Sequence, residues 1–143
     1  MVDILHRVGI GAPIEKVYET LTTLEGHRGW WDANATGDAG EGGVLTFFKH
    51  FDFEVVETTP NALVKWKCVK GSEEWLNTEV VFQLVHKLDQ TFVVFTHAGW
   101  AKPVEFMHHC STKWATFLLS LKALVETGKG RPAPGEVMIY VGG

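Results

Sequence analysis

Apolar side chains recur at helical spacing along the last third of the chain, from Pro103 to Thr127. At about 100° per residue they form one broad stripe on a long amphipathic helix, which has to be buried. Pro103 suits a first turn, Gly128 can adopt the left-handed conformation that ends a helix, and Pro132 prevents continuation. The stripe comprises Phe106, Met107, Cys110, Trp114, Phe117, Leu118, Leu121, Leu124 and Val125. We therefore expect the preceding residues to supply the surface that this helix covers.

The chain begins with one strand and one helix. Apolar and polar residues alternate from Ile4 to Ile10, which predicts a strand. After a turn, Pro13 starts a segment from Ile14 to Leu24 in which apolar residues recur at helical spacing. We expect this helix to end near Glu25-Gly26.

The middle of the chain is predicted to be a loop followed by antiparallel strands. Trp30 and Trp31 follow the first helix, and the Gly-rich, acidic segment Asp32 to Gly43 has no periodicity, so we place both in a loop. Alternation and turn residues then predict five strands. They span Val44 to His50, Phe51 to Thr59, Ala62 to Val69, Trp75 to Lys87 and Thr91 to Trp100.

In the last three of these strands the alternation also predicts which side chains face inward. They are Val64, Trp66 and Cys68, then Leu76, Thr78, Val80, Phe82 and Leu84, then Val93, Phe95 and His97. The order of elements indicates an α+β fold. A curved antiparallel β-sheet of about six strands would wrap around the long C-terminal α-helix, with a cavity between them.

Composition and charge narrow the class of protein. The 143 residues fit one domain, and a net charge of −4 with scattered Lys and Arg gives no basic face for nucleic acid. No apolar run is long enough to span a membrane, and the N-terminus lacks a signal-peptide pattern, so we expect a cytoplasmic protein. Cys68 and Cys110 lie isolated in apolar patterns, which favours reduced core residues over a disulfide.

Several short stretches, taken in order, resemble a known family. They are Gly11-Ala12-Pro13, the helix Ile14 to Leu24, Trp30-Trp31, Thr96-His97-Ala98-Gly99-Trp100, Lys113-Trp114 and Leu121 to Gly128. Together they resemble the START-like helix-grip (SRPBCC) superfamily, in the branch of homologues of the activator of the 90-kDa heat-shock protein ATPase. We expect this domain at residues 1–132, followed by an apolar tail at residues 133–143. The tail would add to the sheet edge, close the cavity or pair with a second subunit.

The resemblance implies a cavity between sheet and helix that binds lipids, sterols or polyketide-like molecules in different members. The candidate ligand-binding residues are Trp30, Trp31, Trp66, Thr78, Phe82, Phe95, His97, Cys110, Trp114 and Phe117. A neutral His97 could hydrogen-bond a ligand carbonyl or hydroxyl, and His109 and Lys113 share one flank of the helix near the mouth. The alternative is that these large side chains simply fill the core.

No motif predicts covalent or metal chemistry, so we expect no catalytic residue, metal or cofactor. None of the three serines lies in a Gly-x-Ser-x-Gly elbow, and the segment Gly37 to Gly43 lacks the lysine of a phosphate loop. His108, His109 and Cys110 are zinc-binding residue types, but neighbouring positions diverge by about 100° around a helix.

Three functions follow as hypotheses. The first is a binding protein for a hydrophobic small molecule, with apolar desolvation as the driving force. The second is a co-chaperone-like regulator of the 90-kDa heat-shock chaperone, which would bind through an outer face. The third is an enzyme like the polyketide cyclases or dehydratases, with His97 moving protons. A homodimer remains open.

Overall fold

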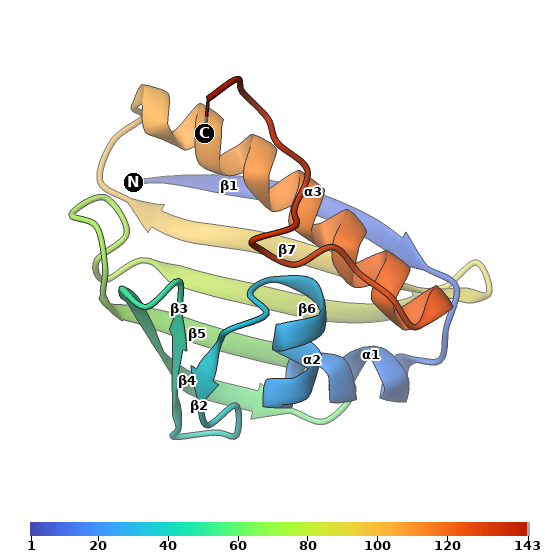
Figure 1. Cartoon of the computed structure of the whole chain (residues 1–143). Coiled ribbons are helices and arrows are strands. Elements are labelled where there is room, and N and C mark those ends of the chain that lie inside the picture. Colours follow the sequence, from blue (N-terminus) through green and yellow to red (C-terminus); the bar gives the residue numbers. More distant parts are fainter. Residues whose placement is uncertain (143) are drawn as a thin grey trace.

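Strands that follow one another along the chain pair with one another, and the first strand returns to pair with the last. The structure, a computed structural model, describes residues 1–142. Its elements are β1 (Val2–Ile10), α1 (Ile14–Leu21), α2 (Leu24–Trp30), β2 (Thr36–Gly37), β3 (Val44–Phe47), β4 (Phe51–Thr59), β5 (Leu63–Lys70), β6 (Glu79–Lys87), β7 (Gln90–Trp100) and α3 (Glu105–Thr127). The strands form a seven-stranded antiparallel sheet in the order β1-β7-β6-β5-β4-β3-β2 (Figure 1).

The predicted α+β helix-grip fold is confirmed. The long helix α3 crosses one face of the curved sheet, and α1 and α2 lie near one end of α3 (Figure 1). The sheet has one strand more than the sequence predicted, because β2 forms within the segment that we expected to be a loop. Thr36 and Gly37 pair there with Thr46 and Leu45 of β3.

The predicted inward faces of the strands are confirmed with one exception. Trp66 in β5, Phe82 in β6 and Phe95 in β7 are completely buried. Leu76, in contrast, is 46% exposed, so its inward placement was wrong. The strand starts at Glu79 instead of Trp75, because residues 72–78 form a turn in which the Trp75 N–H donates to the Ser72 carbonyl.

The prediction of one helix from Ile14 to Leu24, followed by a loop with Trp30 and Trp31, was wrong. The segment forms two helices, because α1 ends at Leu21 and the hydroxyl of Thr23 accepts a hydrogen bond from the Gly26 N–H at 3.1 Å. Such a threonine cap starts a new helix. Trp30 therefore lies in α2, and Trp31 follows directly as its C-terminal cap.

The strand predicted from Val44 to His50 ends earlier, at Phe47. Phe48 and Lys49 have positive φ angles of 53° and 65°, a left-handed conformation that ends the strand and turns the chain into β4. The turn brings the ring of Phe48 to the end of α2, where its centroid lies 5.4 Å from that of Trp31.

Helix α3 matches its prediction closely. It begins at Glu105, two residues after Pro103, and ends at Thr127, where Gly128 adopts φ of 88° and its N–H donates to the Leu124 carbonyl. Its buried side packs on the sheet through side chains such as Trp114, Leu118 and Leu121. Within residues 1–142, none of the helices combines the length and the apolarity needed to cross a membrane.

The C-terminal tail is attached beside α2 and then follows α3. Ala133 forms two backbone hydrogen bonds, from its N–H to the Trp31 carbonyl at 2.8 Å and from the Ala33 N–H at 3.0 Å. The chain then runs back along α3 towards the N-terminal half of that helix (Figure 1). The predicted tail reaches residue 143, which lies outside the described residues. The division into a domain of residues 1–132 and a tail remains a prediction.

Candidate functional site

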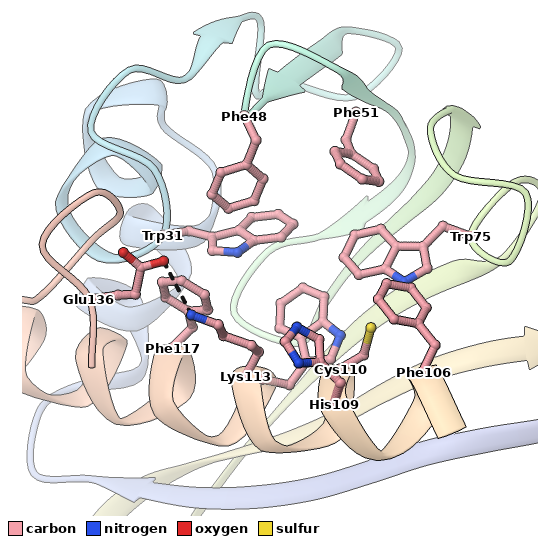
Figure 2. A pocket seen from close by; sticks show the side chains of 11 residues that line it. Trp31, Phe48, Phe51, Trp75, Phe106, His109, Cys110, Lys113, Phe117 and Glu136 are labelled. Carbon is pink, nitrogen blue, oxygen red and sulfur yellow. Dashed lines mark hydrogen bonds and ion pairs between the residues drawn. The ribbon is translucent and has the colours of Figure 1, made fainter. Parts of the chain in front are cut away.

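An aromatic cavity opens between α3 and the loops at one end of the sheet. Its volume is about 210 Å³. The side chains that line it come from α3, the end of α2, the turn between β3 and β4, the first residue of β4, the loop before β6 and the tail (Figure 2). They are Trp31, Phe48, Phe51, Trp75, Phe106, His109, Cys110, Lys113, Trp114, Phe117 and Glu136. We call this cavity the aromatic pocket.

The indole rings of Trp31, Trp75 and Trp114 form the walls of the aromatic pocket. The ring centroids of Trp75 and Trp114 are 6.1 Å apart with an interplanar angle of 12°, and those of Trp31 and Trp114 are 4.8 Å apart. Phe51 extends one wall, with its centroid 5.0 Å from that of Trp75. Large rigid rings present apolar area at a low cost in side-chain entropy, and stacked or tilted contacts fix their orientation.

Helix α3 supplies one side of the aromatic pocket through its periodicity. Positions three or four residues apart lie on one face of a helix, so residues spread over three turns point into the same space. Phe106, His109, Cys110, Lys113, Trp114 and Phe117 have this spacing. The ring planes of Phe106 and His109 are nearly parallel, with 5.7 Å between centroids.

On the side of the aromatic pocket opposite α3, a buried carboxylate connects two of the lining segments. Asp32, only 4% exposed, accepts hydrogen bonds from the backbone N–H of Phe48 at 2.7 Å and of Asn34 at 3.0 Å. The first bond ties the β3–β4 turn to the end of α2. Because Trp31 and Phe48 lie on these two segments, Asp32 fixes their relative position.

A buried chain of hydrogen bonds behind the wall starts at α3. The indole N–H of Trp114 donates to His97 Nδ1 at 3.1 Å, and His97 Nε2 lies 2.8 Å from the Thr78 hydroxyl oxygen. That hydroxyl donates to the Trp75 carbonyl at 2.5 Å. Since Nδ1 accepts, the neutral ring carries its proton on Nε2 and donates it to Thr78. The chain therefore fixes two indole walls through one histidine.

Burial keeps His97 uncharged. It lowers the pKa of the imidazole from 6.5 to about 3, because the buried surroundings disfavour the protonated form. Both ring nitrogens are engaged within the protein, so His97 supports the pocket from behind.

The mouth of the aromatic pocket carries the charged groups. Lys113 Nζ donates to the Glu136 carboxylate at 3.3 Å, joining α3 to the tail (Figure 2). The Tyr140 ring of the tail meets the His109 ring edge-on, with centroids 5.8 Å apart. Deeper inside, burial raises the pKa of the Cys110 thiol to about 11, so the thiol is protonated and apolar in character.

The structure places four of the ten predicted ligand-binding residues in the lining: Trp31, Cys110, Trp114 and Phe117. The other six lie behind it, in the core or in the hydrogen-bond chain: Trp30, Trp66, Thr78, Phe82, Phe95 and His97. Trp66 and Phe82 illustrate the packing, with centroids 5.1 Å apart and no exposed surface. A ligand-binding role for the ten remains a prediction.

Sequence reasoning missed five lining residues: Phe48, Phe51 and Trp75, then Glu136, and Phe106, which was predicted only as part of the buried stripe of the helix. The first three lie at turns or strand ends, where no periodicity gives the direction of a side chain. The aromatic cluster around Phe48 and the position of Trp75 after a predicted turn were the only signals. Glu136 could not be placed, because it depends on where the tail docks.

Other hollows of residues 1–142 lack the aromatic walls; one of about 240 Å³ between α3 and the tail is lined by residues such as Leu119, Ala123 and Val137. A hollow of about 500 Å³ beside α1, α2 and α3 is lined largely by polar and charged side chains, among them Lys16, Glu19 and Arg28. In the same part of the chain, no three His, Cys, Asp or Glu side chains cluster in a way that could hold a metal ion.

Comparison with protein families gave one match. The model of a family described as "Activator of Hsp90 ATPase homolog 1-like protein" matches residues 11–126. The match extends from the turn after β1 to the last turn of α3, and it includes every lining residue except Glu136. A comparison with curated proteins found no match.

Solved structures share the fold. The solution structure of the Aha1 dimer from Colwellia psychrerythraea is 46% identical, with a TM-score of 0.82, and the match covers 91% of this chain and all of that chain. Protein SSP2350 from Staphylococcus saprophyticus is 20% identical, with a TM-score of 0.77 and coverage of 92% and 98%. CalU16 from Micromonospora echinospora is 21% identical, with a TM-score of 0.74 and coverage of 92% and 77%.

Proposed function

The chain belongs to the family of activator of Hsp90 ATPase homolog 1-like proteins, and on that premise we propose that it binds a small hydrophobic molecule in the aromatic pocket. One observation carries this proposal. A cavity of about 210 Å³ is walled by seven Trp and Phe rings, while its charged groups lie at the mouth. Small-molecule sites typically combine mainly apolar walls with a few polar groups in this way.

The size of the cavity favours a flat molecule of about two fused rings. A cavity of about 150 Å³ accommodates benzene, and typical drug-sized ligands occupy about 300 Å³ or more. The aromatic pocket lies between these values. Of the ligand classes implied by the sequence, an aromatic, polyketide-like molecule therefore fits better than a sterol or a long lipid chain.

The expected affinity is modest. A two-ring aromatic molecule would bury about 200 Å² of apolar surface, worth roughly 5 kcal/mol of hydrophobic free energy. Loss of translational and rotational freedom opposes this gain. We therefore expect a dissociation constant of order 1 mM for a simple two-ring compound, and tighter binding only where polar groups add contacts.

Calorimetric titration with naphthalene-2-carboxamide tests the proposal. Cys110→Met should weaken binding at least about tenfold, because the longer side chain fills the cavity that Cys110 lines. Thr112→Met is the matched control, since Thr112 is exposed on another side of α3. The proposal fails if the wild type does not bind the compound, or if both variants bind it as the wild type does.

Regulation of the 90-kDa heat-shock chaperone is the second candidate function, and the description of the family favours it. The test is the ATPase rate of the purified chaperone with and without this protein. An ATPase rate that rises with the concentration of this protein would support the regulatory role. An unchanged rate, together with no complex in sedimentation, would remove it.

We also propose that the chain forms a homodimer. The 46% identical structure is described as a dimer, and apolar side chains are exposed on α3 and on the tail of this chain. They are Leu119, Val137, Met138, Tyr140 and Val141. Light scattering of the purified protein should give twice the chain mass, and Leu119→Lys should lower it. A monomeric wild type would contradict the proposal.

The cytoplasm remains the proposed location. Both cysteines, Cys68 and Cys110, are free and buried, which is common in proteins of a reducing compartment. Fractionation of the source cells with an antibody against the protein tests this location. Recovery outside the cytoplasmic fraction would contradict it.

A further inference from the structure

The mouth of the aromatic pocket contains an ion pair between Lys113 of α3 and Glu136 of the tail. We propose that the ligand is an aromatic acid, whose carboxylate replaces Glu136 as the partner of Lys113. This inference rests on the proposed function, since it names the chemical class that the aromatic pocket selects.

Lys113 is positioned to receive a ligand anion. Among residues 1–142 it is the only Lys or Arg that lines the aromatic pocket, and its side chain is only 20% exposed. Its Nζ lies 5.8 Å from the centroid of the Phe117 ring, so the charge stands at the edge of the apolar wall. A flat molecule against the indoles would place a substituent at the mouth within reach of this ammonium group (Figure 2).

Glu136 already occupies the position that a ligand carboxylate would take. Its side chain is 15% exposed, and its carboxylate accepts from Lys113 at 3.3 Å. No other hydrogen bond involves this carboxylate among residues 1–142. Leaving a partly buried lysine without a partner costs free energy. The carboxylate of Glu136 therefore has to be exchanged for the carboxylate of the ligand.

Within one protomer the tail can leave at low cost, because little of it is buried there. Within the described chain, the Lys113–Glu136 pair is the only hydrogen bond between residues 136–142 and the rest of the protein. Val137, Met138 and Tyr140 are 40%, 51% and 55% exposed. The backbone hydrogen bonds of Ala133 lie before this segment and would stay intact, so they limit the movement to the residues beyond it.

The other titratable groups that line the aromatic pocket bring no second carboxylate to compete for Lys113. Among the lining residues Glu136 is the only carboxylate, and His109 is a further nitrogen base beside the mouth. Displacement of Glu136 therefore removes the negative charge nearest to Lys113. A neutral ligand can accept a hydrogen bond from Lys113, but it brings no negative charge to replace Glu136 and so would leave the ion pair in place.

A matched pair of compounds tests the inference on the full-length protein. Naphthalene-2-carboxylate and naphthalene-2-carboxamide have the same ring system and differ in charge at pH 7. We expect the wild type to bind the acid about tenfold more tightly than the amide by calorimetry. Glu136→Gln should strengthen binding of the acid by about a further tenfold and change binding of the amide less than threefold. Lys113→Met should abolish the preference for the acid.

Glu126→Gln is the control variant, because Glu126 forms the other ion pair of α3, with Lys122, away from the aromatic pocket. It should leave both affinities unchanged. The inference is overturned, and the proposed function stands, if the wild type binds both compounds equally and Glu136→Gln does not change their ratio. If the wild type binds neither compound, both the inference and the proposed function are overturned.

Discussion

The indole N–H of Trp114 donates a hydrogen bond to Nδ1 of His97 across the interface between α3 and β7. This bond connects the helix that forms one wall of the aromatic pocket with the sheet beneath it. Through Thr78 the same histidine reaches the loop that carries Trp75. The shape of the aromatic pocket therefore depends on a residue that does not line it.

Replacing His97 should destabilise the fold and distort the aromatic pocket. His97→Ala leaves a cavity and removes the acceptor of the buried Trp114 N–H, so we expect a loss of about 3 kcal/mol in the free energy of unfolding. His108→Ala, at an exposed position of α3, should change it by less than about 0.5 kcal/mol. Urea unfolding measures both. Equal stability of the two variants would show that the hydrogen-bond chain does not hold the wall.

Stability should fall below neutral pH because of two buried histidines. Burial lowers the pKa of His27 and of His97 to about 3, against about 6.5 in the unfolded chain. Above pH 6.5 both states are neutral and the stability is fully present. As the pH falls towards 3, only the unfolded chain gains these protons, so the native state loses stability.

Between pH 8 and pH 5.5 the two histidines should together lower the free energy of unfolding by roughly 3 kcal/mol. Urea unfolding at both values measures the change. His27→Leu should roughly halve this change between the two pH values, because one titrating group is removed. This holds whatever the substitution does to the stability at pH 8. A stability that does not change between these pH values would contradict the burial of neutral histidines.

Gly26 should resist substitution despite lying in a helix. A Cβ atom at this position would lie 2.0 Å from the carbonyl oxygen of Thr20, where α1 and α2 meet. This clash outweighs the gain of about 1 kcal/mol in helix propensity, so we expect Gly26→Ala to cost about 2 kcal/mol in thermal or urea unfolding. Gly135→Ala, whose nearest contact would be 3.6 Å, is the control and should be nearly neutral. A stabilised Gly26→Ala would refute the close contact.

The two thiols should be unreactive in the native protein. Burial raises the pKa of Cys68 and of Cys110 from 9.0 to about 11, which lowers the thiolate fraction at pH 8 about 100-fold. Iodoacetamide should therefore label the native protein at least about 100 times more slowly than the unfolded protein. In Cys68→Ala, bound naphthalene-2-carboxamide should slow the labelling of Cys110 further. Rapid native labelling would contradict the burial of both thiols.

The sequence was sufficient for the fold because its elements are periodic. Alternation in β5, β6 and β7 predicted that Trp66, Phe82 and Phe95 face inward, and the helical stripe predicted the buried side of α3. The break between α1 and α2 was missed, since the helical spacing continues across it and only the threonine cap marks the new start.

The site was only partly predictable, because half of it depends on segments without periodicity. Trp114 and Phe117 follow from the stripe of α3, whereas Trp75 and Phe48 lie in turns whose direction is set by contacts distant in sequence. The Asp32 carboxylate that holds Phe48 is such a contact. Rings that alternation placed inward, such as Phe82, proved to be packed too tightly to line a cavity.

The most direct test of the central claim is a two-dimensional ¹H–¹⁵N NMR titration with naphthalene-2-carboxamide. Ligand rings stacked on the walls would shift the indole N–H signals of Trp31, Trp75 and Trp114, assigned by substitution. We predict that these signals shift in a saturable manner, while amide signals of the distant helix α1 do not. If the indole signals stay unchanged up to millimolar compound, or if the shifts lie elsewhere, the aromatic pocket is not a binding site.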